Sequence, residues 1–475
     1  MTLKQLQDNK DIREAAKAFL AAVVTAKRRF ASERMNILQG SEPFRVAPGG
    51  EGIAATAELQ DAERRLTRRC FDVKALGSRR VNEYDILSVA WECAATVPVT
   101  DQIENSASTA FVNDFVQRLW DAAVTTCLCF FPNEACVLGS GVRSIDIGPV
   151  RVCRTQDVVQ EITAAGDWTT HKVGSGLELR MVDPQVSAML TDDVLATVKT
   201  GRIHAPEGVL EIERGLRPAD KARAILKIRF PAYCWRVAVE SSRTNAREQA
   251  IWLANIATSL MRLSYPAGHH PLPYGAHEPS PGLPADTLAP SVTVVGKDAL
   301  PLAGYSTAQY LINSELVEAF GKSGLSAKMR DLVQADTNLV GRRLAQGLGW
   351  LTRGRQAHSQ PERLLFFFTA VEALLFTDDR NTPVTQTITR HAATLLSDDV
   401  AKRAVIAKEL ADLYNVRSQL VHGGEREVSN SHANRIQELA EALYRTMLHK
   451  AKFDTKLKDF VKQVRDASFG FPWTA

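Results

Sequence analysis

The sequence predicts a multidomain protein in which an all-α helical bundle at the C-terminus follows a helical N-terminal region and an α+β middle domain. The chain has 475 residues, a length at which about three domains are usual. Helical periodicity dominates residues 1–135 and again 306–475, whereas short strand-like runs occupy 140–264. Residues 265–305 are rich in Pro, Gly and Ala, as expected for a linker or an extended crossover.

The composition is that of a globular protein without a strong charge bias. Hydrophobic residues make up 45% and charged residues 24%, and the net charge of +4 comes from 58 basic and 54 acidic side chains. This charge is too small to indicate nucleic-acid binding by the whole chain, so any basic surface must be local. Since no apolar run approaches about 18 residues and the start is not that of a signal peptide, we expect a cytoplasmic protein and no membrane partner.

The cysteines do not form a recognisable metal site. Their number is odd and no signal peptide precedes them, so reduced and mostly buried thiols are expected. The group Cys127, Cys129 and Cys136 lacks both the spacing and the fourth ligand of a zinc site. We therefore assign no metal and no cofactor. The seven cysteines are Cys70, Cys93, Cys127, Cys129, Cys136, Cys153 and Cys234.

Four side chains in the linker-like stretch are a second candidate for metal binding: His269, His270, His277 and Glu278. Histidine and glutamate can ligate a metal, but the alternative is that these are loop side chains without one. We favour the alternative, because the stretch shows no apolar periodicity that would hold ligands in place.

The N-terminal region is predicted to contain helices near residues 12–23, 58–76 and 111–131, the last ending at Pro132. The second of these carries Arg64, Arg65, Arg68 and Arg69 on a charged face. They could contact a nucleic acid or an acidic partner, but we favour the alternative that they form a solvated helix face.

The middle part shows the period of strands. A Gly-Pro turn separates the first two candidates, and a helix near residues 246–260 follows the last. There is neither a Gly-rich loop between a strand and a helix nor a Walker lysine, so an enzyme centred here has no supporting constellation. The predicted strands cover residues 144–147, 150–153, 177–181, 209–212, 225–230 and 235–239.

The C-terminal part is predicted to be helical throughout. A capping box with a proline opens one helix at Ser359, and Thr382-Pro383 opens the next. Residues 450–465 have mixed charge and should form a solvated end. The other predicted helices cover residues 306–322, 328–355, about 400–423 and about 436–447.

A local basic segment lies within this helical part. Residues 338–363 contain five arginines and a single acid, Glu362. We predict RNA-binding roles for four of these arginines: Arg342, Arg343, Arg353 and Arg355.

The most informative stretch is Tyr414–Gly424, where a helical pattern is stopped by two glycines just after His422. Leu413, Val416 and Leu420 form an apolar stripe, whereas Asn415, Ser418 and His422 form a polar one at the same spacing. Arg417 flanks this polar stripe. Arg and His at a helix end suit a phosphate site. The same Arg-to-His spacing at Arg353 and His358 lacks this context.

In this context the stretch resembles the Arg-x(4–6)-His signature of HEPN domains. The segments Asn415–Ser418 and Val421–Gly424 resemble those of the Apea-like branch of that family. The similarity continues in Leu364–Leu375, which looks like the family's glutamate-bearing helix with Glu372, and in Asp379–Thr385. It covers about residues 325–466.

The resemblance implies a metal-independent endoribonuclease that cleaves RNA at a site shared by two subunits of a homodimer. Arg417 and His422 would be catalytic, with Asn415 and Ser418 in supporting polar roles. Many HEPN nucleases have Asn, Asp or His after the arginine, where this chain has Ser418. The resemblance also points to a toxic effector of antiviral defence or abortive infection. The N-terminal 300 residues would restrain this effector until a phage-derived protein or nucleic acid arrives.

Two alternatives remain open from the sequence. Glu372 lies on an apolar helix face, where a carboxylate needs a partner. It would orient Arg417 or His422, or it would form a structural salt bridge elsewhere in the bundle. The whole bundle could also be non-catalytic and serve RNA binding or dimerisation, since a fold alone does not establish activity.

Overall fold

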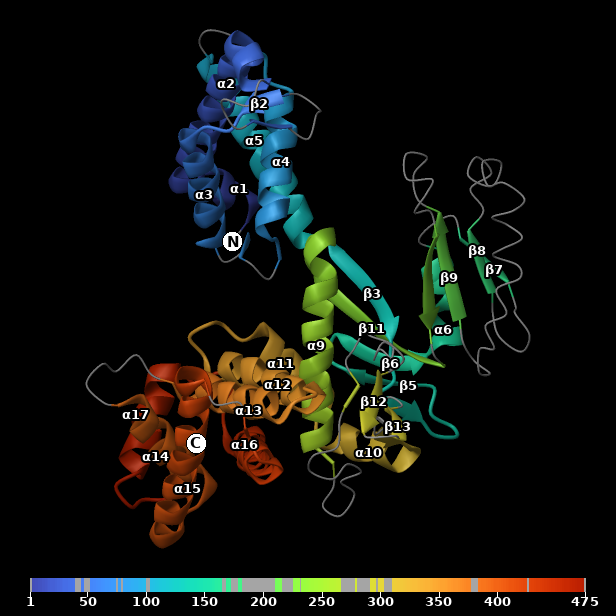
Figure 1. Ribbon diagram of the computed structural model, residues 1–475, viewed down its shortest axis with the longest axis vertical. Helices are drawn as coiled ribbons and strands as arrows, with labels where there is room; N and C mark the ends of the chain where they lie inside the picture. The colour runs from blue at the N-terminus through green and yellow to red at the C-terminus, as the bar shows by residue number, and fades with distance from the viewer. Residues whose placement is uncertain are drawn as a thin grey trace. The chain divides into compact units, whose positions relative to one another are not determined.

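The computed structural model resolves the chain into two compact units, Met1–Cys129 with Ala238–Ala250 and Phe130–Val237 with Ile251–Ala475 (Figure 1). The described part is mostly helical, and its small sheets are largely antiparallel. No helix in this part is long and apolar enough to cross a membrane. The described residues are 2–38, 44–46, 52–73, 76–77, 80–99, 103–164, 168–171, 178–181, 210–215, 225–230, 232–265, 278–279, 291–295, 298–302, 310–376, 383–424 and 427–473.

The first unit is a helical body around an aromatic core. Phe19 packs edge-on against Trp91, with ring centroids 5.3 Å apart, and the Trp91 indole N–H donates to Glu63 at 2.9 Å. This bond gives a polar partner to both buried groups. The elements are α1 (Leu3–Gln7), α2 (Lys10–Leu38), β1 (Phe44–Val46), β2 (Gly52–Ala54), α3 (Ala57–Phe71), α4 (Glu83–Ala95) and α5 (Asn105–Val124).

The predicted helix 111–131 is too long. Helix α5 ends at Val124, and the following residues form strand β3 (Thr126–Pro132). Two successive threonines and two phenylalanines favour a strand here, because β-branched and aromatic side chains fit a pleated surface.

The strands of the second unit form small sheets. Strands β3, β11, β6 and β5 make one four-stranded sheet in that order, and β10, β9, β8 and β7 make another. The predicted strands are confirmed within the described residues. Their bounds are β4 (Cys136–Leu138), β5 (Ser144–Ile147), β6 (Val150–Arg154), β7 (Trp168–His171), β8 (Glu178–Met181), β9 (Leu210–Gly215), β10 (Ile225–Phe230) and β11 (Tyr233–Glu240), with helix α6 (Thr155–Ala164) after β6.

Helix α9 (Arg243–Leu263) confirms the helix predicted near residues 246–260. The linker-like stretch contains an antiparallel hairpin, β12 (Ser291–Val295) with β13 (Asp298–Leu302). Strand β14 (Tyr310–Ile312) pairs in parallel with β4, so the predicted helix 306–322 is shorter and begins at Ser314. His269, His270 and His277 lie outside the described residues.

The C-terminal helices build the bundle that carries the candidate site (Figure 1). Two predictions need correction. The helix expected over 328–355 is two helices, since Leu339 leaves the helical conformation and forms a bridge with Lys456. The bounds are α10 (Ser314–Lys322), α11 (Leu325–Gln334), α12 (Val340–Gln356), α13 (Gln360–Leu375), α14 (Val384–Leu396), α15 (Val400–Ser418), the π-helical turn η4 (Gln419–Gly423), α16 (Asn430–Lys450) and α17 (Leu457–Ala467).

The second correction concerns residues 450–465, which are not simply a solvated end. They include most of α17, which buries Phe460 and Val464. These two apolar side chains are four residues apart and therefore share one helix face, although charged neighbours hide the pattern.

Glycine allows the closest packing in the bundle. A side chain on Gly347 of α12 would run into the Tyr444 ring of α16. The Tyr444 hydroxyl donates to the Ala370 carbonyl of α13 at 2.7 Å, so this one tyrosine ties three helices together.

Candidate functional site

The helix that bears the arginine and histidine forms as the sequence predicts. The Asp399 side chain caps its start, accepting from the Ala401 and Lys402 backbone N–H groups at 2.8 and 3.3 Å. Its last turn widens into η4, and Gly424 follows with φ of 73°. Only glycine takes this left-handed conformation at little cost. π-Helical turns of this kind often occur at functional sites.

Arg417 and Glu372 meet across two helices. The Arg417 Nη2 atom of α15 lies 3.6 Å from the Glu372 Oε1 atom of α13, and their side chains are 25% and 23% exposed. The Tyr414 hydroxyl donates to the same carboxylate oxygen at 3.0 Å. The Arg417 guanidinium also lies 5.5 Å from the centre of the Tyr414 ring. Glu372 thus has partners, and in this chain they are Arg417 and Tyr414.

Tyr414 is a member of the site that the sequence reasoning did not assign. It precedes Arg417 by three residues, a helical spacing that places both on one face and could have indicated its role. Its ring packs edge-on against Phe368, with centroids 5.4 Å apart. Burial and the neighbouring Glu372 carboxylate raise the pKa of the Tyr414 hydroxyl, so it stays a proton donor to that carboxylate.

The polar stripe faces solvent. Asn415 and His422 are exposed, and Ser418 is half-buried. Among the described residues, no hydrogen bond or ion pair joins His422 to Arg417 or Glu372. The imidazole is therefore accessible to another molecule, and the Arg417–His422 motif itself supplies one histidine.

The predicted RNA-binding arginines separate into two groups. Arg342 and Arg343 are half-buried on α12 and Arg353 is exposed. Arg355 is only 1% exposed and forms two bonds with the Glu441 carboxylate, at 2.7 and 3.2 Å. The prediction that Arg355 binds RNA is therefore wrong, because a buried and paired guanidinium cannot reach a phosphate.

Comparison with known proteins identifies no relative. No family model, no curated protein and no solved structure matches the chain. In the part of the chain that the structure describes, no three His, Cys, Asp or Glu side chains come together as a metal site would require.

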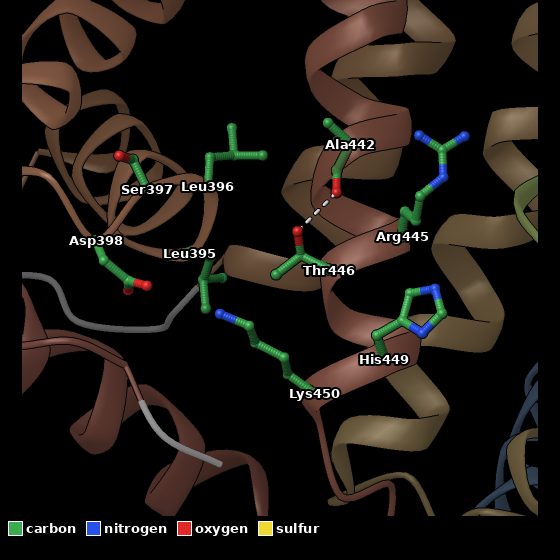
Figure 2. Close-up of a pocket in the computed structure, with 9 residues that line it drawn as sticks. All are labelled: Leu395, Leu396, Ser397, Asp398, Ala442, Arg445, Thr446, His449 and Lys450. Carbon is green, nitrogen blue, oxygen red and sulfur yellow. Dashed lines mark hydrogen bonds between the residues drawn. The ribbon is translucent and has the colours of Figure 1, made fainter. Parts of the chain in front are cut away.

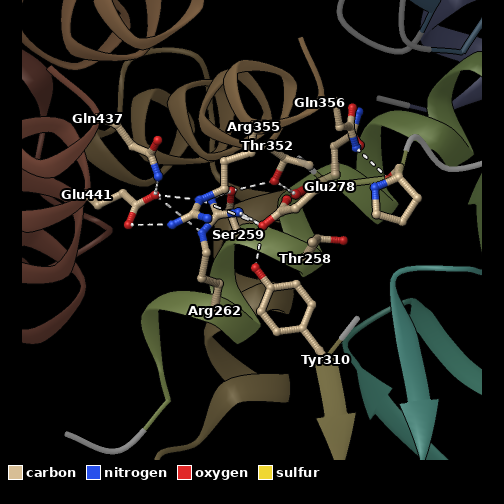
Figure 3. Close-up of polar contacts among 12 residues, drawn as sticks. Thr258, Ser259, Arg262, Glu278, Tyr310, Thr352, Arg355, Gln356, Gln437 and Glu441 are labelled. Atoms are coloured by element: carbon tan, nitrogen blue, oxygen red, sulfur yellow. Dashed lines mark hydrogen bonds and ion pairs between the residues drawn. The ribbon is translucent and has the colours of Figure 1, made fainter. Parts of the chain in front are cut away.

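Arg355 belongs to a buried cluster of ion pairs that the sequence reasoning did not find (Figure 3). The Arg262 guanidinium lies 2.6 Å from the Glu278 carboxylate and 3.7 Å from that of Glu441. Two guanidinium groups and two carboxylates make the cluster neutral, and Tyr310 donates to Glu278. Glu278, which we considered as a metal ligand, is an ion-pair partner instead.

The cluster changes the protonation behaviour of its members. Burial alone would raise the pKa of the Glu441 carboxyl, but the two neighbouring guanidinium groups outweigh it and lower this pKa to about 2. The carboxylate thus stays charged at neutral pH. The role of the cluster is to join residues 278–279, α9, α12 and α16 into one body.

A surface cavity of about 420 Å³ lies elsewhere in the bundle (Figure 2). It is lined by the ends of α14 and α16 and by Ser397 and Asp398, which follow α14. Its titratable side chains are Asp398, Arg445, His449 and Lys450. Asp398 lies two residues before Val400, the first residue of α15, whereas Arg417 lies near the other end of that helix, about 26 Å from Val400 at 1.5 Å per residue. The cavity is therefore separate from the Arg417 and His422 site.

Proposed function

We propose that the C-terminal bundle is a HEPN-like module and that the protein is a metal-independent endoribonuclease. The observation that supports this most directly is the pairing of Arg417 with Glu372 beside a glycine-terminated helix end that presents His422 to solvent. The resemblance of this stretch to the Apea-like branch supplies the reaction type.

Cleavage of RNA without a metal needs a base, an acid and a positive charge. The base takes the proton of the 2′-hydroxyl, whose oxygen attacks the adjacent phosphorus, and the acid protonates the departing 5′-oxygen. The products are a 2′,3′-cyclic phosphate and a 5′-hydroxyl. Histidine suits both proton transfers because it titrates near neutrality, and arginine suits the phosphate because it offers two donors and a permanent charge.

Two proton transfers need two groups and the Arg417–His422 motif supplies one histidine, so the proposed site is shared by two subunits. A two-fold dimer with the ends of α15 adjacent supplies two His422 and two Arg417 side chains. The exposure of His422 supports this arrangement. Glu372 and Tyr414 hold the Arg417 side chain in place, and Asn415 and Ser418 add polar contacts.

The second candidate function is a non-catalytic module that binds RNA or forms a dimer. The neutralisation of Arg417 by Glu372 favours it, because a paired guanidinium attracts phosphate less strongly than a free one. In this case Arg417, His422 and Glu372 form a polar contact and no RNA is cut.

A ribonuclease of this type would harm the cell that makes it, so we propose that the remainder of the chain restrains it. The trigger would be a phage-derived protein or nucleic acid, and the biological role antiviral defence by abortive infection. The first unit, with its own hydrophobic core, supports an independently folded regulatory part.

The two candidates are separated by expression in a host cell. The ribonuclease predicts toxicity and new RNA ends carrying 5′-hydroxyl groups, both relieved by His422→Ala. The matched control is His432→Ala, which removes an exposed histidine from the start of α16. Equal toxicity of the two variants would contradict the ribonuclease. The shared site also predicts at least a dimer by light scattering at micromolar concentration, and an active monomer would contradict it.

A further inference from the structure

The solvent-facing side of α12 has an unusual composition. Six positions of this helix are not buried, and none carries a carboxylate: Arg342, Arg343, Gln346, Trp350, Arg353 and Gln356. At about 100° per residue, the first five of these fall within an arc of roughly 100°. We call these five residues the α12 face.

Aromatic rings from two other helices extend the α12 face. The Trp350 and Phe366 rings are stacked, with centroids 5.6 Å apart, and Trp252 of α9 meets Trp350 edge-on at 5.8 Å. The Arg353 guanidinium lies 5.3 Å from the Trp350 ring centre and 5.6 Å from that of Trp252. All three aromatic side chains are half-buried, so part of each remains accessible.

The arginines of the α12 face are incompletely paired. The Arg342 Nε atom is buried and has no hydrogen-bond partner among the described residues. Arg343 makes a long bond of 3.4 Å to the Ala373 carbonyl. The Arg353 side chain is exposed and contacts the Trp252 and Trp350 rings, and among the described residues no ion pair neutralises its charge. The Arg342 Nε atom itself is too buried to meet a ligand, so the phosphate contacts fall to the accessible parts of the Arg342, Arg343 and Arg353 side chains, since guanidinium groups suit phosphate oxygens.

We propose that the α12 face, together with Trp252 and Phe366, is a binding track for single-stranded RNA. Permanent positive charge holds the phosphates, and aromatic and guanidinium planes stack with unpaired bases, a combination that a duplex cannot use because its bases are already stacked. This inference rests on the proposed function and adds to it the strandedness of the substrate.

One end of the track lies nearer the proposed catalytic residues than the other. From Arg353 to Arg342 the helix extends about 16 Å, the length of roughly five stacked nucleotides. The Arg343 partner, Ala373, is the residue next to Glu372 on α13. The single acid of the segment, Glu362, is exposed near the Arg353 end. A strand would therefore run from the aromatic end toward Arg343 and the level of the Glu372–Arg417 pair.

The test uses a fluorescent, fully 2′-O-methylated RNA 12-mer, which cannot be cleaved through its 2′-oxygen, and measures binding to the full chain by anisotropy over a range of salt concentrations. Arg353→Gln and Arg342→Gln should each weaken binding and each lower the salt slope by about 0.7, the value for one phosphate contact on a single strand. Trp350→Leu should weaken binding roughly tenfold without changing the slope, since stacking is not electrostatic. Lys402→Gln, which removes an exposed charge from α15, is the matched control and should change neither quantity.

A duplex of the same sequence should bind at least about tenfold more weakly than the single strand. Equal binding of both, or unchanged binding in the Arg353 and Trp350 variants with intact thermal unfolding, would overturn the track. Variants that leave RNA binding intact but dissociate an oligomer would assign this face to a protein contact instead. Because the probe is not cleaved, its binding is measured independently of cleavage, so failure of the ribonuclease proposal is distinguishable from failure of the track.

Discussion

The buried ion cluster makes the sharpest prediction about stability. Glu441→Gln keeps the shape of the side chain but removes one of four charges, so the cluster of Arg262, Arg355 and Glu278 is left with a net charge of +1 at a site that is 0–1% exposed. Breaking a buried pair by removing one partner costs about 3–5 kcal/mol, because the remaining charge is uncompensated in a medium of low dielectric constant.

A surface ion pair provides the matched control. Arg435 lies 2.6 Å from Glu409, with side chains that are 43% and 34% exposed. Glu409→Gln should therefore cost at most about 1 kcal/mol, although the bond lengths resemble those in the cluster. The measurement is urea unfolding followed by circular dichroism, comparing the free energy of the transition in the two variants.

A double substitution tests more stringently whether the uncompensated buried charge causes the loss of stability. Arg355→Met with Glu441→Leu removes one charge of each sign and restores neutrality, so it should recover most of the stability that Glu441→Gln loses. If Glu441→Gln costs no more than Glu409→Gln, or if the double variant is as unstable as Glu441→Gln, burial and net charge do not govern this cluster.

Two further predictions concern stability. Burial, followed by the charges of Arg390 and Arg465, lowers the pKa of His391 from its usual 6.5 to about 4, so the unfolded chain binds more protons between these values. The free energy of unfolding should fall by about 3 kcal/mol as the pH drops through this window, and His391→Asn should reduce that slope in unfolding measured at several pH values; an unchanged slope would refute the assignment. Gly347→Ala should destabilise by at least about 1–3 kcal/mol through overpacking against Tyr444, whereas Gly321→Ala, with nothing within 4 Å of the new methyl group, should be neutral or stabilise by up to about 1 kcal/mol. Equal melting temperatures of the two glycine variants would contradict the packing argument.

Local signals in the sequence predicted the helix of the candidate site well. The start of α15 at Asp399 and its end before Gly424 both depend on residues close to the helix ends, so caps and glycines suffice to place them. The neighbourhood of Arg417 and Glu372 could be anticipated because an isolated carboxylate on an apolar helix face needs a partner. Which partner it takes was left open by the sequence.

Long-range contacts explain most of what the sequence did not predict. Glu278 lies in a Pro- and Gly-rich stretch with no periodicity, and its partner Arg355 is 77 residues away, so no local pattern marks the pair. Arg355 itself shares a basic segment with solvent-facing arginines, and only the packing of α16 shows that it is buried. Strand β3 was missed because its apolar residues continue the pattern of α5 without a break.

The central claim is tested most directly with the purified full chain, an unstructured RNA and an excess of EDTA. The proposal predicts cleavage that leaves 2′,3′-cyclic phosphate ends. Arg417→Ala and His422→Ala should each reduce the rate by about 10² to 10⁴ without loss of folding, and His358→Ala should leave it nearly unchanged. Cleavage that survives His422→Ala, or that stops when the chelator is added, would show that the chemistry lies elsewhere in the chain.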